Sequence, residues 1–164
     1  DGRDDTFYPT QGQYLDLSAS IHAEALVGSF DYDRFKLKGL TFHPLSDRIV
    51  ASARVQYQQV EGDPPFFAVP WVSLRGIPAL RYQGRRVAMG EAEFRYRLSE
   101  RWSSLAFAGL GWREQREGAP DEDIYNYGIG ARFRVLKDQN VWVGVDIAQG
   151  PEDTNWYIQV GQAW

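Results

Sequence analysis

The feature of this sequence that most restricts its fold is an alternation of apolar and polar residues with a period of two, repeated eight times. Such alternation is typical of β-strands, because successive side chains point to opposite sides of a strand. The alternating runs cover residues 12–24, 30–42, 48–61, 85–98, 101–113, 125–136, 141–147 and 155–164. No segment has the periodicity of a helix longer than one or two turns. We therefore predict an all-β protein of about eight strands.

The lengths of the connections indicate how these strands are arranged. The connections near residues 43–47, 98–101 and 137–140 are short, whereas those at 24–30, 62–84, 114–124 and 149–154 are longer. Short and long connections alternate strictly, as in bacterial membrane barrels with short periplasmic turns and long external loops. The runs also supply roughly the 9–11 residues that a tilted transmembrane strand needs. We predict an antiparallel transmembrane β-barrel in which residues 1–164 form one domain, with the long loop 62–84 folded into the barrel.

The composition fits a barrel with an apolar outside and a polar inside. Aromatic residues make up 15 % of the chain although the mean hydropathy is −0.47, and several of them, such as Tyr57, Trp102 and Trp156, stand at the ends of runs. Aromatic side chains at strand ends are typical of the membrane–water interface. No run of 18 apolar residues is present, so we expect strands and not a helix to cross the bilayer. A soluble ligand-binding barrel is the alternative, and it predicts the inverse pattern, with an apolar interior and a charged exterior.

The polar faces of the runs carry many charges that we expect inside the barrel. They are Asp16, Glu24, Arg34, Lys36, Lys38, Arg54, Glu91, Glu93, Arg95, Arg97, Arg132, Arg134 and Asp146. The interior of an eight-stranded barrel is only just wide enough for its own side chains, and a buried unpaired charge costs several kcal/mol. We therefore expect a network of ion pairs that fills the barrel. The alternative is a lumen that conducts ions or handles a substrate.

Residues for catalysis or metal binding are few. The two histidines, His22 and His43, are assigned to opposite ends of the barrel, and there is no cysteine. Ser20, His22 and Glu24 share one face, but that spacing follows from any alternating strand. The net charge of −4 gives no reason to expect nucleic acid as a partner. We expect no enzymatic activity, no catalytic residue, no metal and no cofactor.

Several segments resemble sequence motifs of one family, in the order in which that family has them. They are D-G-R-D-D-T-F-Y-P-T-Q-G at 1–12, S-L-R-G-I at 73–77, E-A-E-F-R at 91–95, F-A-G-L-G at 107–111, V-D-I-A at 145–148 and Y-I-Q-V-G at 157–161. They are similar to the C-terminal barrel half of the bacterial surface antigen superfamily, the BamA/TamA-type assembly and translocation barrels. The resemblance implies a place in the lipid bilayer of the bacterial outer membrane. It also implies a role in inserting or translocating proteins, through weak closure between the first and last strands.

The resemblance singles out Arg75 and Gly76, which match the Arg-Gly-aromatic motif of the family's long loop. The resemblance implies that this motif contributes to barrel stability and activity when the loop folds inward. Two positions depart from the pattern: Gly109 replaces the aspartate that usually pairs with this arginine, and Ile77 replaces the aromatic residue. Arg75 would then need another anion, and the alternative is a solvated loop arginine. The candidate partners on inward faces are Glu91, Glu93 and Asp146.

The end and the size of the chain give two further expectations. Trp164 closes the last alternating run and resembles a terminal signal read by the barrel-assembly machinery, so we expect the chain to be a client of that machinery. The family usually has sixteen strands and periplasmic domains, so a chain with eight is a minimal member, a trimmed piece or one half of a homodimer. Two functions stay open: an assembly factor, or a passive small envelope barrel with a charge-filled lumen and no transport activity.

Overall fold

A computed structural model of the chain describes residues 1–22, 30–114, 122–136 and 140–164. Within these ranges the protein is all-β, as predicted, and it contains no helix long and apolar enough to cross a membrane. The strands are β1 (Gly12–His22), β2 (Tyr32–Pro44), β3 (Ile49–Gly62), β4 (Arg86–Arg97), β5 (Trp102–Arg113), β6 (Ile124–Leu136), β7 (Val141–Gln149) and β8 (Thr154–Val160). Each strand lies within a few residues of a predicted alternating run. The predicted end of the first run, with Glu24, falls outside the described residues.

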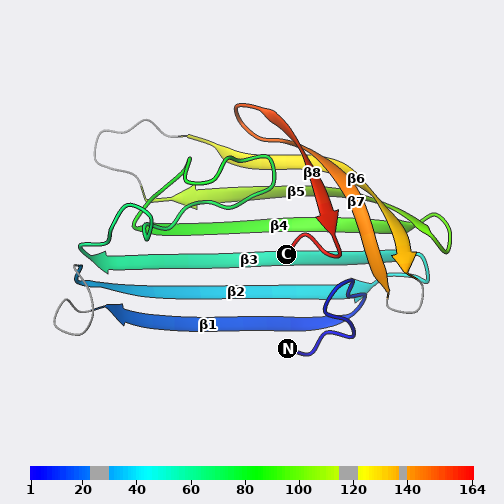
Figure 1. The fold of residues 1–164 in the computed structure, drawn as a ribbon, viewed down its shortest axis with the longest axis horizontal. Helices are drawn as coiled ribbons and strands as arrows, with labels where there is room; N and C mark the ends of the chain where they lie inside the picture. The colour runs from blue at the N-terminus through cyan, green and yellow to red at the C-terminus, as the bar shows by residue number, and fades with distance from the viewer. Residues whose placement is uncertain (23–29, 115–121, 137–139) are drawn as a thin grey trace.

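The eight strands form one antiparallel sheet in which each strand pairs with the next along the chain. Figure 1 shows β1 to β5 running side by side, with β7 and β8 turned steeply across them. The sheet is open, because in the described part of the chain β1 and β8 each pair with one strand only. β8 has seven residues, half the 14 of β3. The prediction of eight antiparallel strands is confirmed, but the ring that would make them a closed barrel is absent from this structure.

The two faces of the sheet differ in polarity. The outer face exposes large apolar side chains, among them Leu15, Leu17, Ile21, Val55, Phe94, Leu110, Ile129, Ile147 and Ile158. The inner face buries polar and charged side chains, among them Arg54, Glu91, Glu93, Arg95, Arg132 and Asp146. A continuous exposed apolar surface of this kind is typical of contact with lipid. The observed arrangement is the inverse of what a soluble barrel would have.

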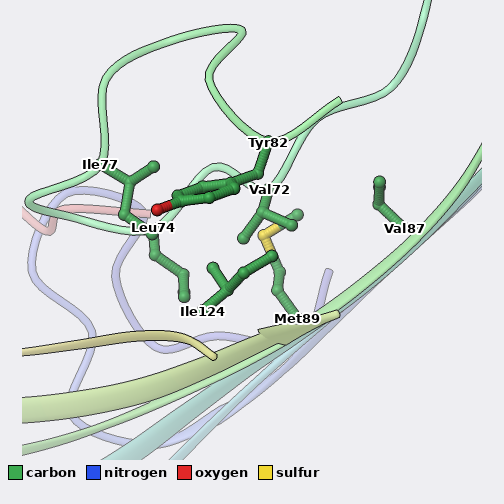
Figure 2. Close-up of a cluster of buried hydrophobic side chains, with 7 residues drawn as sticks. All are labelled: Val72, Leu74, Ile77, Tyr82, Val87, Met89 and Ile124. Atoms are coloured by element: carbon green, nitrogen blue, oxygen red, sulfur yellow. The ribbon is translucent and has the colours of Figure 1, made fainter. Parts of the chain in front are cut away.

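The long loop between β3 and β4, residues 63–85, packs on the inner face. Its two arms are joined by a bridge between Trp71 and Gln83 and by a hydrogen bond from Val72 N to Tyr82 O of 3.0 Å. Figure 2 shows the apolar side chains of the loop gathered against the ends of two strands. This cluster consists of Val72, Leu74, Ile77 and Tyr82 of the loop, Val87 and Met89 of β4, and Ile124 of β6. The burial of these side chains holds the loop in place.

The end of the chain corrects one prediction. The last alternating run was expected to continue to residue 164 with Trp164 facing outward, but β8 ends at Val160. Gly161 has a φ of +76°, and a Cβ atom at this position would lie 2.6 Å from the carbonyl oxygen of Phe7. Gln162 then donates a backbone hydrogen bond of 2.7 Å to the same oxygen. The glycine turns residues 161–164 onto the inner face, where they meet the N-terminal segment.

Candidate functional site

The turn that carries Arg75 is seated against the last two strands. Gly76 has a φ of +86°, and a Cβ atom there would lie 3.2 Å from the side chain of Ala148 on β7. The backbone N–H of Gly76 donates to the hydroxyl of Tyr157 at 2.9 Å, and its carbonyl accepts from the Asn155 side chain at 3.1 Å. This close fit requires glycine. It presents the preceding residue, Arg75, to the middle of the inner face.

Arg75 lies within salt-bridge distance of three carboxylates. Its Nη2 is 2.8 Å from Oε1 of Glu91, and its Nη1 is 2.9 Å from Oε2 of Glu93 and 3.2 Å from Oδ2 of Asp146. The guanidinium also lies over the ring of Phe107, 3.5 Å from its centroid. Arg75 is 8 % exposed and the carboxylate residues are 0–2 % exposed. The structure thus brings to Arg75 all three carboxylates named from the sequence.

Two further arginines complete the cluster. Arg132 holds Asp146 with two hydrogen bonds, of 2.5 Å and 2.9 Å. Arg95 Nε lies 3.8 Å from Glu93, and the Arg95 guanidinium donates to the carbonyl of Pro9 in the N-terminal segment. Three arginines and three carboxylates are therefore joined by ion pairs within 4.0 Å, and Arg54, also buried, interacts electrostatically with Glu91 as a fourth cation. A buried ionic cluster needs such pairing, since an unpaired charge away from water is strongly destabilising.

Glycines leave the room that this cluster occupies. A Cβ atom at Gly130 would lie 1.9 Å from Oδ1 of Asp146, and one at Gly144 would lie 2.5 Å from Cδ of Arg132. Both glycines are at inner-face positions, on β6 and β7. The small residues on these strands thus serve to accommodate the pair of Arg132 and Asp146.

The departure at Gly109 has a structural explanation. Glu91 stands directly opposite Gly109 in the pairing of β4 with β5, and it supplies the carboxylate that this position lacks. The vacated space holds Asn126 of β6, whose Nδ2 donates to Oε2 of Glu91 at 2.6 Å. Sequence reasoning missed Asn126, although its place at an inner-face position of the sixth run is a signal that could have identified it.

The C-terminal tail also joins the cluster. Trp164 Nε1 donates to Oε1 of Glu91 at 2.6 Å, and Gln162 Nε2 donates to Oε1 of Glu93 at 3.1 Å. The guanidinium of Arg54 lies 5.8 Å from the centroid of the Trp164 ring, within the range of a cation–π contact. The tail is therefore tied to the same two carboxylates of β4 as the long loop.

A second tie fastens the outer part of the loop. Arg81 pairs with Glu152 in the connection between β7 and β8, and the Tyr82 hydroxyl donates to Glu152 at 3.3 Å. The hydrogen bond from Arg81, with its positive charge, lowers the pKa of Glu152. Burial and the neighbouring Glu152 charge raise the pKa of Tyr82. This contact is exposed, so we expect it to stabilise the fold far less than the buried cluster.

The residues weighed for catalysis are not brought together. His22 stacks on Tyr32, with ring centroids 4.2 Å apart, while His43 shares a 2.8 Å hydrogen bond with Thr41 at the other end of β2. Within the described ranges no group of three or more histidine, cysteine, aspartate or glutamate side chains could hold a metal ion. The chemistry that the cluster around Arg75 provides is the binding of one part of the chain to another.

Comparison with known families bears on the N-terminal part of the chain. Residues 1–66 match the family described as the Omp85 superfamily domain. The match covers β1, β2 and β3 with the first residues of the long loop, and the Arg75–Gly76 motif lies beyond it. No curated protein matches the chain significantly. Omp85 superfamily proteins are bacterial outer-membrane proteins. The resemblance inferred from the motifs is thus confirmed as a similarity: residues 1–66 are similar to an Omp85 superfamily domain, and they form β1 to β3 of an eight-stranded antiparallel sheet.

Proposed function

We propose that this chain assists the insertion of proteins into the outer membrane by offering an unpaired strand edge to an incoming strand. The observation that carries the proposal is the open sheet, in which one side of β1 and one side of β8 have no partner strand among the described residues. Free backbone N–H and C=O groups at an edge are a template for strand addition. Hydrocarbon cannot satisfy these groups, so pairing with a client strand is favourable inside a bilayer.

The length of β8 supports the same proposal. A strand of seven residues is shorter than the roughly 9–11 residues that a tilted strand needs to cross the hydrocarbon core. The apolar surface beside β8 therefore spans a shorter distance across the membrane than the apolar surface along β3, which has 14 residues. Lipid beside a short apolar surface thins to match it. A thin region next to a free edge lowers the barrier to inserting a strand at that place.

A passive role for the chain, as a homodimer, is the second candidate. Two copies could pair β1 of one with β8 of the other at both seams, which would satisfy every edge and give a ring of sixteen strands. The ion-paired cluster and the packed loop on the inner face favour a filled interior without transport. In this alternative the edges serve assembly of the protein itself and are not available to clients.

Cysteine cross-linking distinguishes the two candidates, since the chain has no cysteine of its own. The variant A19C/I158C places one thiol on each edge strand, and A92C/I158C, with one thiol on the central strand β4, is the matched control. Oxidation in liposomes to a species of twice the chain mass, absent in the control, would support the homodimer. Insertion predicts instead a monomer that speeds the folding of a small client barrel into the same liposomes, measured by heat-modifiable gel mobility. A folding rate equal to that in empty liposomes would refute the insertion proposal.

A further inference from the structure

Four arginines lie at or next to the ends of β3, β4, β5 and β6, where short turns connect the strands; Figure 1 shows these strand ends on the right. We call Arg48, Arg97, Arg101 and Arg134 the rim arginines. The N–H of Arg97 donates to the carbonyl of Arg48 at 2.8 Å, and the N–H of Arg134 donates to that of Arg101 at 2.9 Å. The rim arginines thus form two pairs on neighbouring strands. Like charges placed directly opposite each other destabilise a sheet.

Other arginines of the chain are matched by acids. At the opposite end of the sheet, glutamates lie within 4.0 Å of Arg81, Arg86 and Arg113. On the inner face, carboxylates lie within 4.0 Å of Arg75, Arg95 and Arg132. Within the described residues, by contrast, no carboxylate oxygen lies within 4.0 Å of any rim arginine. The short turns also carry Asp47 and Glu100, so within the described residues the rim holds four arginines against two acids, in a chain whose net charge is −4.

The rim arginines surround a hollow. Arg48, Arg97 and Arg134 line a cavity of about 310 Å³ together with Leu98, Ser99 and Glu100. Among the described residues that line this cavity, three arginines stand against one glutamate, which favours a positive potential. Arg134 is also held in place, because it donates to Oδ1 of Asn140 at 2.7 Å and lies over the Trp142 ring at 4.8 Å. A cationic group that is already ordered loses less entropy when it binds a ligand.

We infer that the rim arginines bind an acidic segment of another protein on the periplasmic side. Arg97 of β4 and Arg134 of β6 occupy inner-face positions, and Arg48 and Arg101 directly precede β3 and β5, whereas the adjacent Tyr96 and Trp102 are exposed on the outer face, toward lipid. The guanidinium groups therefore face the aqueous mouth and not the bilayer, at the end where membrane barrels have their periplasmic turns. A guanidinium fork matches a carboxylate in a bidentate manner. The inference does not depend on insertion activity and applies equally to a passive homodimer.

The geometry of the row fits an extended acidic chain. Neighbouring strands are about 4.8 Å apart, and alternate side chains of an extended chain are about 6.8 Å apart. The three spacings between four strand ends add up to about 14 Å, so an acidic segment of about five extended residues spans the row. Binding would also relieve the repulsion within each arginine pair. Binding of the acidic segment and stability of the fold are thus coupled, because the bound carboxylates offset the positive charge of the arginine pairs.

The test uses the folded protein in nanodiscs of phosphatidylcholine and a fluorescein-labelled hexaglutamate peptide as the probe. Fluorescence anisotropy should show binding that weakens as salt rises. The variant R48Q/R97Q/R134Q should bind the peptide at least about tenfold more weakly than the wild type does. The control variant R81Q/R86Q/R113Q removes the same charge from the opposite end and should bind as the wild type does. Equal affinity in the two variants, or no binding by the wild type, would overturn the inference.

Two further readouts separate this site from a structural or lipid-binding role. Because the rim arginines repel each other, the urea midpoint of R48Q/R97Q/R134Q should be unchanged or higher, and a lower midpoint would mean that they stabilise the fold instead. The peptide is then measured in nanodiscs that contain phosphatidylglycerol. Retained binding supports a protein ligand. Loss of binding there, with retention in phosphatidylcholine, would identify a lipid headgroup as the occupant and overturn the inference.

Discussion

Replacing Arg75 with glutamine should destabilise the protein more than any other single change to the inner face. The substitution removes the guanidinium that pairs with Glu91, Glu93 and Asp146, so buried negative charge loses this partner. The carboxylate residues are 0–2 % exposed, and solvent therefore does little to screen that charge. Removing one partner of a buried ion pair costs about 3–5 kcal/mol.

The cost should stay near that of one charge because the three carboxylates do not lose all their donors. Asp146 keeps both hydrogen bonds from Arg132, while Glu91 keeps those from Asn126 and Trp164. The loss of the contact with the Phe107 ring adds a smaller amount, about 0.5–2 kcal/mol. Since small domains are stable by only about 5–15 kcal/mol, R75Q should unfold at much lower urea.

Equilibrium unfolding in urea, followed by tryptophan fluorescence in detergent micelles, measures this change. R81Q is the control, since it breaks the exposed pair with Glu152, and its midpoint should not move measurably. The double variant R75Q/E91Q removes the uncompensated charge and should recover part of the stability. If R75Q fails to fold, R75K, which keeps the charge but not the fork, should still fold with a lowered midpoint. A wild-type midpoint for R75Q, or no recovery in R75Q/E91Q, would refute the role of ion pairing in the cluster.

Three other changes test further parts of the structure. G109D restores the family's aspartate, but a Cβ atom there would lie 2.5 Å from Oδ1 of Asn126, so the variant should have a lower urea midpoint than the wild type, not a higher one. G161V forces a β-branched residue into a position with φ of +76°, and it should release residues 161–164 from the inner face, detected as faster hydrogen exchange there. Partial burial would raise the pKa of Asp5, but hydrogen bonds from the Asn140 side chain and two backbone N–H groups outweigh it and lower the pKa below 3.8. A carboxyl group whose pKa is lowered by folding stabilises the folded state at pH values above its ordinary pKa. This contribution disappears as the pH falls through the folded pKa. Urea titrations on either side of pH 3.8 should therefore show that D5N loses less stability on acidification than the wild type.

The alternation of the sequence predicts the strands well because it follows directly from the two-residue repeat of a strand. It failed to orient β5, where apolar residues occur on both faces. The structure places Leu105 and Phe107 on the inner face and Ala106 and Ala108 on the outer face. Phe107 faces inward because it lies against the Arg75 guanidinium, which comes from a loop about 30 residues away along the chain. A pattern confined to one strand has no information about such a contact.

The charged cluster was predictable in its members but not in its connections. Glu91, Glu93 and Asp146 were recognisable as inner-face acids, and a buried charge must have a partner. The inward course of the tail was not predictable, because Trp164 continues the outward alternation of the last run. Its direction is decided by Gly161 and by Phe7, which is distant in the sequence. The alternation also cannot predict whether the first and last strands pair, because it specifies the face on which a side chain lies and not the neighbouring strand.

The open sheet is held together by segments that cross its inner face, and this explains how stability and free edges can coexist. The N-terminal segment accepts a hydrogen bond from Gln162 at Phe7, Gln162 donates to Glu93, and Glu93 pairs with Arg75 of the long loop. Both ends of the chain are thus joined to the loop through side chains of β4. These contacts lie on the inner face and not along the free sides of β1 and β8, although at the start of β1 the Gln13 carbonyl accepts a hydrogen bond of 2.8 Å from the N–H of Gly2. A strong interior and available edges are therefore compatible in one small sheet, and substitutions within the cluster need not alter the edges directly.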